Sequence, residues 1–154
     1  MTAFTKMHGL GNDFIVLDAR ELSNGIPDVI NRAFAIALAD RHFGIGCDQI
    51  LVIRPSRQAD VFLQILNSDG SEAVACGNGT RCVADYIMQE FGCDQIAIET
   101  ATGILQSWRP VENPGDVSVD MGPVYLDWES VPLANEVNTL SVDLGPPAPV
   151  PAVC

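Results

Sequence analysis

The hydrophobic residues of the chain fall into short runs whose spacing separates strands from helices. Seven runs have strand length and are bounded by Gly, Pro, Asn or Asp residues, as is typical of strands joined by turns. These runs cover residues 4–8, 14–18, 50–53, 61–66, 96–100, 103–108 and 117–121. Thr-Gly and Asn-Pro-Gly turns separate the last three runs, which predicts a β-meander.

Two stretches show helical periodicity instead. Residues 27–41 carry apolar side chains three and four positions apart, and Pro27 suits the first turn of a helix. A second helix follows Gly79 and presents an apolar stripe that stops at Gly92. Beyond Gly122 the apolar runs become short, and the end of the chain is rich in proline. The pattern therefore predicts mixed strands and helices, with little regular structure after Gly122.

Composition and charge narrow the classes of protein. Hydrophobic residues make up 47% of the 154 positions and charged residues 18%, which indicates a globular chain rather than a disordered one. No apolar run is long enough to span a bilayer, and the first residues lack the features of a signal peptide, so we expect a cytoplasmic protein without a membrane partner. Only eight Lys and Arg oppose twenty Asp and Glu, giving a net charge of −12, which disfavours binding to nucleic acid.

The five cysteines predict free thiols rather than a disulfide framework. Their number is odd, and the chain is not of the small secreted type that depends on disulfides. No two of them have the spacing of a structural zinc site, and Cys76 and Cys82 are separated by five residues, so we expect no metal. Cys47, Cys82 and Cys93 are interpreted as packing residues.

The most informative stretch is residues 75–82, Ala-Cys-Gly-Asn-Gly-Thr-Arg-Cys, where a thiol precedes a helix. At the start of a helix the first N–H groups have no intrahelical partner and the dipole is positive, so a thiolate or a bound carboxylate is favoured there. Gly77 and Gly79 allow the backbone to approach a ligand, and Asn78 tolerates a left-handed turn. From the residues alone, two interpretations stay open: a reactive Cys76, or a helix-capping turn after an inert thiol.

Two other polar stretches predict turns, and neither has the pattern of a ligand-binding loop. Residues 9–13, Gly-Leu-Gly-Asn-Asp, lack the third glycine and the helix of a dinucleotide loop, so we interpret them as a hairpin turn. Residues 67–72, Asn-Ser-Asp-Gly-Ser-Glu, are too short for a calcium loop and also predict a turn. His8 and His42 have no cluster of partner residues and are interpreted as structural.

Four blocks of sequence are informative when they are considered together and in their order along the chain. They are residues 4–14 (Phe-Thr-Lys-Met-His-Gly-Leu-Gly-Asn-Asp-Phe), 41–49 (Arg-His-Phe-Gly-Ile-Gly-Cys-Asp-Gln), 67–72 and 75–82. Together they closely resemble the amino-terminal half of the diaminopimelate epimerases, over roughly the first four-fifths of the chain. The resemblance implies an α+β fold, with a curved antiparallel sheet wrapped around a central helix. It also implies two such lobes, with the active site in the cleft between them.

By the same resemblance the function is an epimerase that interconverts LL- and meso-diaminopimelate, in lysine and peptidoglycan-precursor biosynthesis. Its substrate is this small molecule, and it uses neither pyridoxal phosphate nor a metal. Cys76 is implied to be one of two catalytic thiols that act on opposite faces of the α-carbon. The residues implied to contact substrate are Asn12, Gln49, Asn67, Gly77 and Asn78.

This chain departs from the family pattern in what it lacks. The second catalytic cysteine, an Asn-Pro-His segment and a Glu-Arg pair belong to the family's second half, and Cys154 lies in no comparable turn. We therefore expect residues 1–122 to form the first lobe and residues 123–154 the incomplete beginning of the second, and the fragment alone to be inactive. The alternatives are a non-catalytic substrate-binding lobe, or a related isomerase of the same fold, such as a proline racemase-like or phenazine-pathway relative. Homodimerisation of the full-length protein is left open.

Overall fold

The computed structural model describes residues 3–21, 25–27, 29–131, 133–143 and 151–152. The chain divides into two compact units, residues 1–121 and residues 122–154, and each is considered by itself. The first unit contains all the predicted strands and both predicted helices. Within the described part of the chain, neither helix is both long and apolar enough to cross a membrane.

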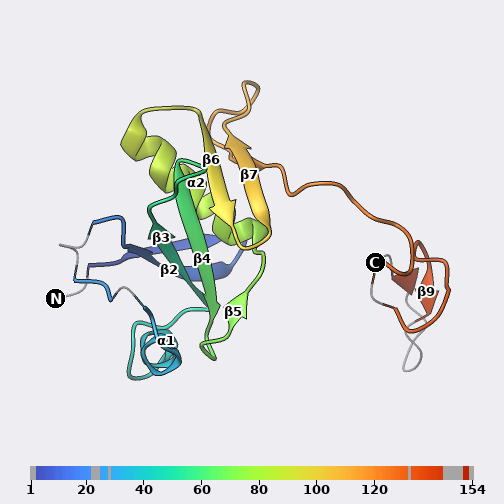
Figure 1. Ribbon diagram of the computed structural model, residues 1–154, viewed down its shortest axis with the longest axis horizontal. Coiled ribbons are helices and arrows are strands. Elements are labelled where there is room, and N and C mark those ends of the chain that lie inside the picture. The colour runs from blue at the N-terminus through green and yellow to red at the C-terminus, as the bar shows by residue number, and fades with distance from the viewer. Residues whose placement is uncertain (1–2, 22–24, 28, 132, 144–150, 153–154) are drawn as a thin grey trace. The chain divides into compact units, whose positions relative to one another are not determined.

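The first unit is a single sheet with two helices (Figure 1). The strands follow one another in the order β1-β2-β3-β4-β6-β7-β8, and β5 pairs with β4. The strands are β1 (Thr5–Gly9), β2 (Asn12–Asp18), β3 (Gln49–Arg54), β4 (Val61–Asn67), β5 (Glu72–Ala73), β6 (Gln95–Thr100), β7 (Gly103–Trp108) and β8 (Ser118–Val119). The helices are α1 (Arg32–Ala39) and α2 (Gly77–Phe91).

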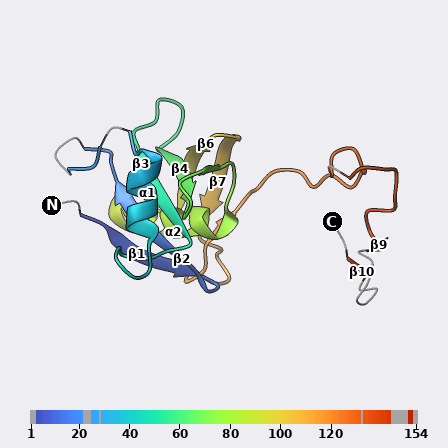
Figure 2. The same ribbon diagram turned by 90° about the horizontal axis from the view of Figure 1, so that it is seen from below.

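The sheet curls around α2, which contacts strands from β1 at one edge to β8 at the other (Figure 2). This confirms the predicted fold class, a curved sheet around a central helix. The strands are not all antiparallel, however, because β2 pairs with β3 and β4 pairs with β6 in parallel. The reason is topological: α1 lies between β2 and β3 in the chain, and α2 lies between β4 and β6. A crossover of this length returns the chain in the same direction, whereas a tight turn reverses it.

Side chains from the two faces of the sheet form two hydrophobic clusters. Phe14 and Val16 of β2 pack in the cluster that includes α2, whereas the alternate residues Ile15 and Leu17 pack in the cluster that includes α1. Because successive side chains of a strand point to opposite faces, β2 is buried on both sides. The same holds for β3, whose residues 50–53 are fully buried. This explains why both strands appear in the sequence as continuous apolar runs.

The first helix is shorter than predicted. It begins at Arg32 rather than near Pro27, because the Asn31 side chain accepts a hydrogen bond from the N–H of Phe34 (2.9 Å) and caps the helix there. Val29, which fits the helical spacing, lies outside the helix and is 77% exposed. The expected strand at residues 117–121 is also reduced, to the two residues of β8.

The second unit has little regular structure among its described residues. Two short strands, β9 (Val142–Asp143) and β10 (Pro151–Ala152), pair antiparallel. The hydroxyl of Thr139, which is buried, donates a hydrogen bond to the carbonyl of Leu126 (2.5 Å). Cys154 and most of the proline-rich end lie outside the described residues.

Candidate active site

Three strand ends meet at one edge of the curled sheet. Asn12 begins β2, Gln49 begins β3 and Asn67 ends β4. In the register of the sheet Gln49 lies opposite Asn67 and beside Phe14. Parallel strands begin at the same edge, and the antiparallel neighbour ends there. The three polar residues that the resemblance marks for substrate contact are therefore brought together from distant parts of the sequence.

The turns at this edge hold the polar side chains in place. Leu10 and Gly11 both have positive φ (55° and 88°) and form the two-residue hairpin loop before Asn12, which confirms the predicted turn. On the other side, the side chain of Gln49 donates a hydrogen bond to the side-chain oxygen of Asn67 (3.0 Å). The Asn67 amide group in turn donates to the Ser71 hydroxyl (3.0 Å), across the turn predicted at residues 67–72.

Cys76 lies where α2 begins, and its sulfur has both a hydrogen-bond donor and a hydrogen-bond acceptor beside it. It is the N-cap residue, with extended backbone (φ −155°, ψ 99°), and its Sγ accepts a hydrogen bond from the N–H of Gly79 (3.3 Å). The same sulfur lies 3.8 Å from the side-chain oxygen of Asn12, which can accept the proton of a thiol. A backbone donor stabilises the thiolate and a carbonyl acceptor stabilises the thiol. The environment therefore suits a residue that must exist in both protonation states.

Two glycines in the first turn of α2 allow other groups to come close to its backbone. A Cβ placed on Gly77 would meet no atom nearer than 3.9 Å, whereas one on Gly79 would lie 2.9 Å from Cδ2 of Leu51 and 3.4 Å from Cys76 Sγ. Gly77 therefore leaves the backbone open, and Gly79 allows the helix start to pack against the core. The N–H groups of Gly77 and Asn78 belong to the first turn, where no helix carbonyl can reach them.

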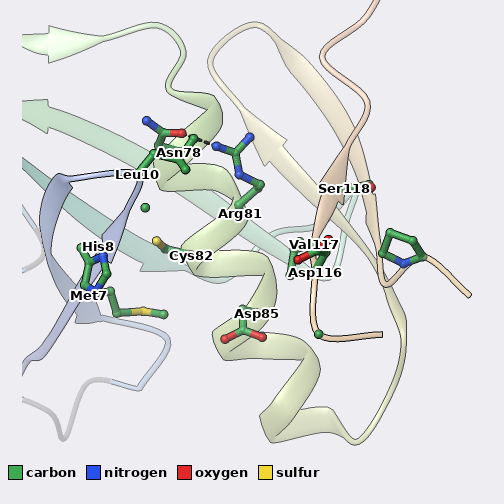
Figure 3. A pocket seen from close by; sticks show the side chains of 13 residues that line it. Met7, His8, Leu10, Asn78, Arg81, Cys82, Asp85, Asp116, Val117 and Ser118 are labelled. Atoms are coloured by element: carbon green, nitrogen blue, oxygen red, sulfur yellow. Dashed lines mark hydrogen bonds between the residues drawn. The ribbon is translucent and has the colours of Figure 1, made fainter. Parts of the chain in front are cut away.

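Asn78 lines a cavity that Cys76 does not line. It lines a cavity of about 530 Å³ that also involves His8 and Leu10 on one side and Asp116 and Ser118 on the other (Figure 3). Within it the side-chain oxygen of Asn78 accepts a hydrogen bond from Arg81, drawn as a dashed line. Cys76 is not among the residues that line this cavity. Of the six residues predicted for the site, Asn78 is thus the one whose side chain is engaged elsewhere.

A network of charged side chains adjoins Asn12, and the sequence did not single it out. Asp13 accepts hydrogen bonds from Lys6 Nζ (2.8 Å) and Arg41 Nη2 (2.6 Å), and Asp48 accepts from Arg41 Nη2 (2.8 Å) and Asn12 Nδ2 (3.0 Å). The hydrogen bond from Arg41 holds the pKa of Asp13 well below its ordinary value, and that from Asn12 lowers the pKa of Asp48. Both carboxylates are therefore charged at neutral pH. The signal in the sequence was their position, since Asp13 comes directly before the buried residues 14–17 and Asp48 comes two residues before the buried residues 50–53.

Two of the other described cysteines, Cys47 and Cys82, are more buried than Cys76. All four described cysteines are free thiols, and Cys47 and Cys82 are buried in the two hydrophobic clusters. Burial raises the pKa of both of these thiols. Cys93 is only half-buried, against the expectation of a buried residue, although it packs on the cluster around α2. Within the described residues no group of three or more His, Cys, Asp or Glu side chains is arranged to hold a metal ion.

We predict that Cys76 is alkylated faster than Cys82 and Cys93 in the folded chain. The N–H of Gly79 supports its thiolate, whereas the raised pKa of Cys82 disfavours the reactive form. Iodoacetamide labelling under native conditions, followed by mass mapping, measures the three rates. Labelling in denaturant serves as the control and should bring the rates close together. Faster labelling of Cys82 or Cys93 in the native chain would mean that the turn at Cys76 has another geometry.

Replacing Gly79 by alanine should destabilise the unit by about 1–3 kcal/mol, because the added methyl group overpacks a fully buried Leu51. The matched control is Gly77→Ala, where the methyl group makes only ordinary van der Waals contacts and should change stability by no more than about 0.5 kcal/mol. Thermal unfolding of the two variants provides the comparison. Equal stability of the two variants would show that the start of α2 is not packed against Leu51 as described.

Solved structures with a similar fold define the class to which this arrangement belongs. A hydroxyproline epimerase from Agrobacterium vitis matches with a TM-score of 0.58, covering 78% of this chain and 41% of that one, at 16% sequence identity. A phenazine biosynthesis protein of the PhzF family from Bacillus anthracis matches with a TM-score of 0.50, covering 77% of this chain and 37% of that one, at 25% identity. The fold is thus the one shared by these epimerase and PhzF proteins.

Sequence comparison narrows the class to one family. The family model for diaminopimelate epimerase matches residues 4–126, and the chain belongs to that family. The diaminopimelate epimerase of Rhodospirillum centenum is 51% identical over 144 residues, which cover 92% of this chain and 47% of that protein. That of Acidiphilium cryptum is 47% identical over 152 residues, covering 98% of this chain and 53% of the relative. The chain therefore spans about half the length of the curated relatives it matches.

Proposed function

We propose that this chain supplies one half of the active site of an enzyme that interconverts LL- and meso-diaminopimelate, with Cys76 as one of its two acid–base groups. The observation that carries the proposal is the surroundings of Cys76. Its sulfur has a backbone donor in Gly79 and a side-chain acceptor in Asn12. Family membership supports the same substrate and reaction.

The chemistry requires a group of this kind. Inverting an α-carbon means removing its proton on one face and delivering a proton on the other, so one group acts as base while a second acts as acid. The roles exchange in the reverse direction, and each group must be competent in both protonation states. A thiol balanced between a donor and an acceptor meets that requirement without a cofactor.

The positions of the other site residues indicate the role that we propose for each. Asn12, Gln49 and Asn67 would contact the substrate at the strand ends, where their amide groups lie on one sheet edge. Gly77 and Asn78 would hold a substrate carboxylate through their backbone N–H groups at the start of α2, which also stabilises the charge that develops on removal of the proton. The Asn78 side chain, bonded to Arg81, does not take part in this proposal.

The second half of the site would come from a second lobe. We propose that residues 1–122 form the first lobe and residues 123–154 the start of the second, so that the facing acid and the contacts to the distal end of the substrate are supplied by further chain. Free thiols at the four described cysteines are typical of a reducing compartment, and we propose the cytoplasm.

The experiment that tests the proposal joins this chain to the carboxyl-terminal half of the Rhodospirillum centenum relative and measures conversion of LL- to meso-diaminopimelate. The proposal expects conversion by the fusion. A fusion that is folded and binds diaminopimelate but does not convert it would instead indicate a non-catalytic substrate-binding lobe.

A further inference from the structure

We propose that Asp48 is a positioning residue, which orients the amide of Asn12 so that its carbonyl oxygen faces Cys76. The proposal rests on the proposed function only in giving Cys76 its acid–base role. The orientation itself follows from contacts within this chain.

The two ends of the Asn12 amide group differ in hydrogen bonding. One of its ends donates hydrogen bonds and the other accepts them. Asp48 Oδ2 lies 3.0 Å from Asn12 Nδ2, and the lowered pKa of Asp48 means that its carboxylate is ionised and can only accept. The nitrogen of Asn12 must therefore face Asp48. Its oxygen is then left on the side of Cys76, 3.8 Å from Sγ.

Asp48 is itself held by several hydrogen bonds. Its Oδ2 also accepts from the backbone N–H of Asp13 (3.0 Å), and its own N–H donates to Oδ1 of Asp13 (3.1 Å). Arg41 Nη2 donates to both carboxylates, at 2.6 Å to Asp13 and 2.8 Å to Asp48. These reciprocal bonds join the start of β2 to the segment just before β3. Asp48 therefore has little freedom to release the Asn12 amide.

The orientation of the Asn12 amide determines which hydrogen-bond partners the sulfur of Cys76 has. With Asn12 in this orientation the sulfur has one donor, the Gly79 N–H, and one acceptor, the Asn12 oxygen. If the amide turned round, its N–H groups would give the sulfur a second donor and hold it as a thiolate. A thiolate held in this way returns a proton less readily, which would impair the acid half of the reaction. Asp48 thus acts on the chemistry without touching the reacting atoms.

The test is a double-mutant cycle on the alkylation rate of Cys76, measured with iodoacetamide from pH 6 to pH 9 on the chain as it exists. The four proteins are the wild type, Asp48→Asn, Asn12→Ala and the double variant. Asn at position 48 has the size of Asp but can donate as well as accept, so the Asn12 amide is free to turn. The charged groups in the network around Asp48 are Lys6 of β1, Asp13 of β2 and Arg41, and the titratable group that interacts with Cys76 directly is Cys82 of α2.

With Asn12 present, Asp48→Asn should move the rate profile to lower pH and raise the rate at pH 7 by about threefold or more, the value of one modest hydrogen bond. With Asn12 replaced by alanine, the same change at position 48 should raise the rate by less than about 1.5-fold, since only a screened charge effect remains. A lateral shift of the profile reports the population of thiolate. A uniform rise at every pH would report access to the sulfur instead.

An equal effect of Asp48→Asn in both backgrounds would overturn the proposal, because the carboxylate would then act through its charge and not through Asn12. A uniform rise without a lateral shift would overturn it as well. Circular dichroism of each variant tests folding. If Asp48→Asn does not fold, the cycle is repeated with Asp48→Ser, which leaves the Asp13–Arg41 pair in place. The cycle needs no substrate, so a failure of epimerisation and a failure of this proposal are observed separately.

Discussion

Replacing Cys76 by alanine in the fusion with the second lobe should abolish interconversion of LL- and meso-diaminopimelate. The substitution removes one of two acid–base groups, and loss of such a group reduces the rate by about 10⁴-fold or more. Substrate binding should survive, because the strand-end amides and the helix-start N–H groups remain. Chiral separation of the products measures the rate, and calorimetric titration measures binding.

The matched control for this substitution is Cys82→Ala. Cys82 lies on the same helix, six residues further along, but it is buried in the hydrophobic cluster around α2. Its replacement should cost stability through the small cavity it leaves, with activity per folded molecule retained. If Cys76→Ala kept substantial activity, Cys76 would have no place in the mechanism. If Cys82→Ala lost as much activity per folded molecule as Cys76→Ala, the loss would not be specific to Cys76.

The second large effect concerns the proposed second lobe. The 154-residue chain alone should show no conversion of diaminopimelate above background, whereas the fusion should convert it. The proposed mechanism places the facing acid and part of the substrate contacts in the second lobe, so the combined loss is expected to be roughly 10⁴-fold or more. Circular dichroism of the isolated chain shows whether it is folded. Conversion by the isolated, folded chain would contradict a mechanism that needs a second lobe.

The sequence predicted the strands and the central helix because their signals are local. The buried run at residues 50–53 indicates a strand by composition alone, and Gly92, with φ of 66°, ends α2 where the pattern stops. The start of α1 was predicted too early for a related reason. Apolar periodicity extends beyond a helix when the flanking chain also packs on the core, as Ile30 does, and only the cap at Asn31 marks the true start.

The site was only partly visible in the sequence. The turn around Cys76 could be recognised from its own residues, because a thiol before a glycine-rich helix start is a local pattern. Asn12, Gln49 and Asn67 could not be joined by local reasoning, which interpreted two of the stretches as ordinary turns. Both are turns. Their polar residues come to one edge of the sheet only because β2 pairs in parallel with β3 and β3 pairs antiparallel with β4.

The contact between Asn12 and Asp48 illustrates what remained out of reach. It spans 36 residues of sequence and depends on α1 returning the chain beside β2. Arg41, just after α1, then reaches both Asp13 and Asp48. No periodicity or motif encodes such a contact, since it is a product of tertiary packing.

Solvent deuterium incorporation at the α-carbon of LL-diaminopimelate tests the central claim most directly, because it reports removal of the proton itself. It is measured in heavy water for the isolated chain, for the fusion and for the fusion carrying Cys76→Ala. The proposed mechanism predicts deuterated meso product from the fusion, and none above background from the isolated chain or from the fusion carrying Cys76→Ala, because inversion needs both groups. Formation of deuterated meso product by the Cys76→Ala fusion at the rate of the unsubstituted fusion would contradict the role of Cys76 as an acid–base group.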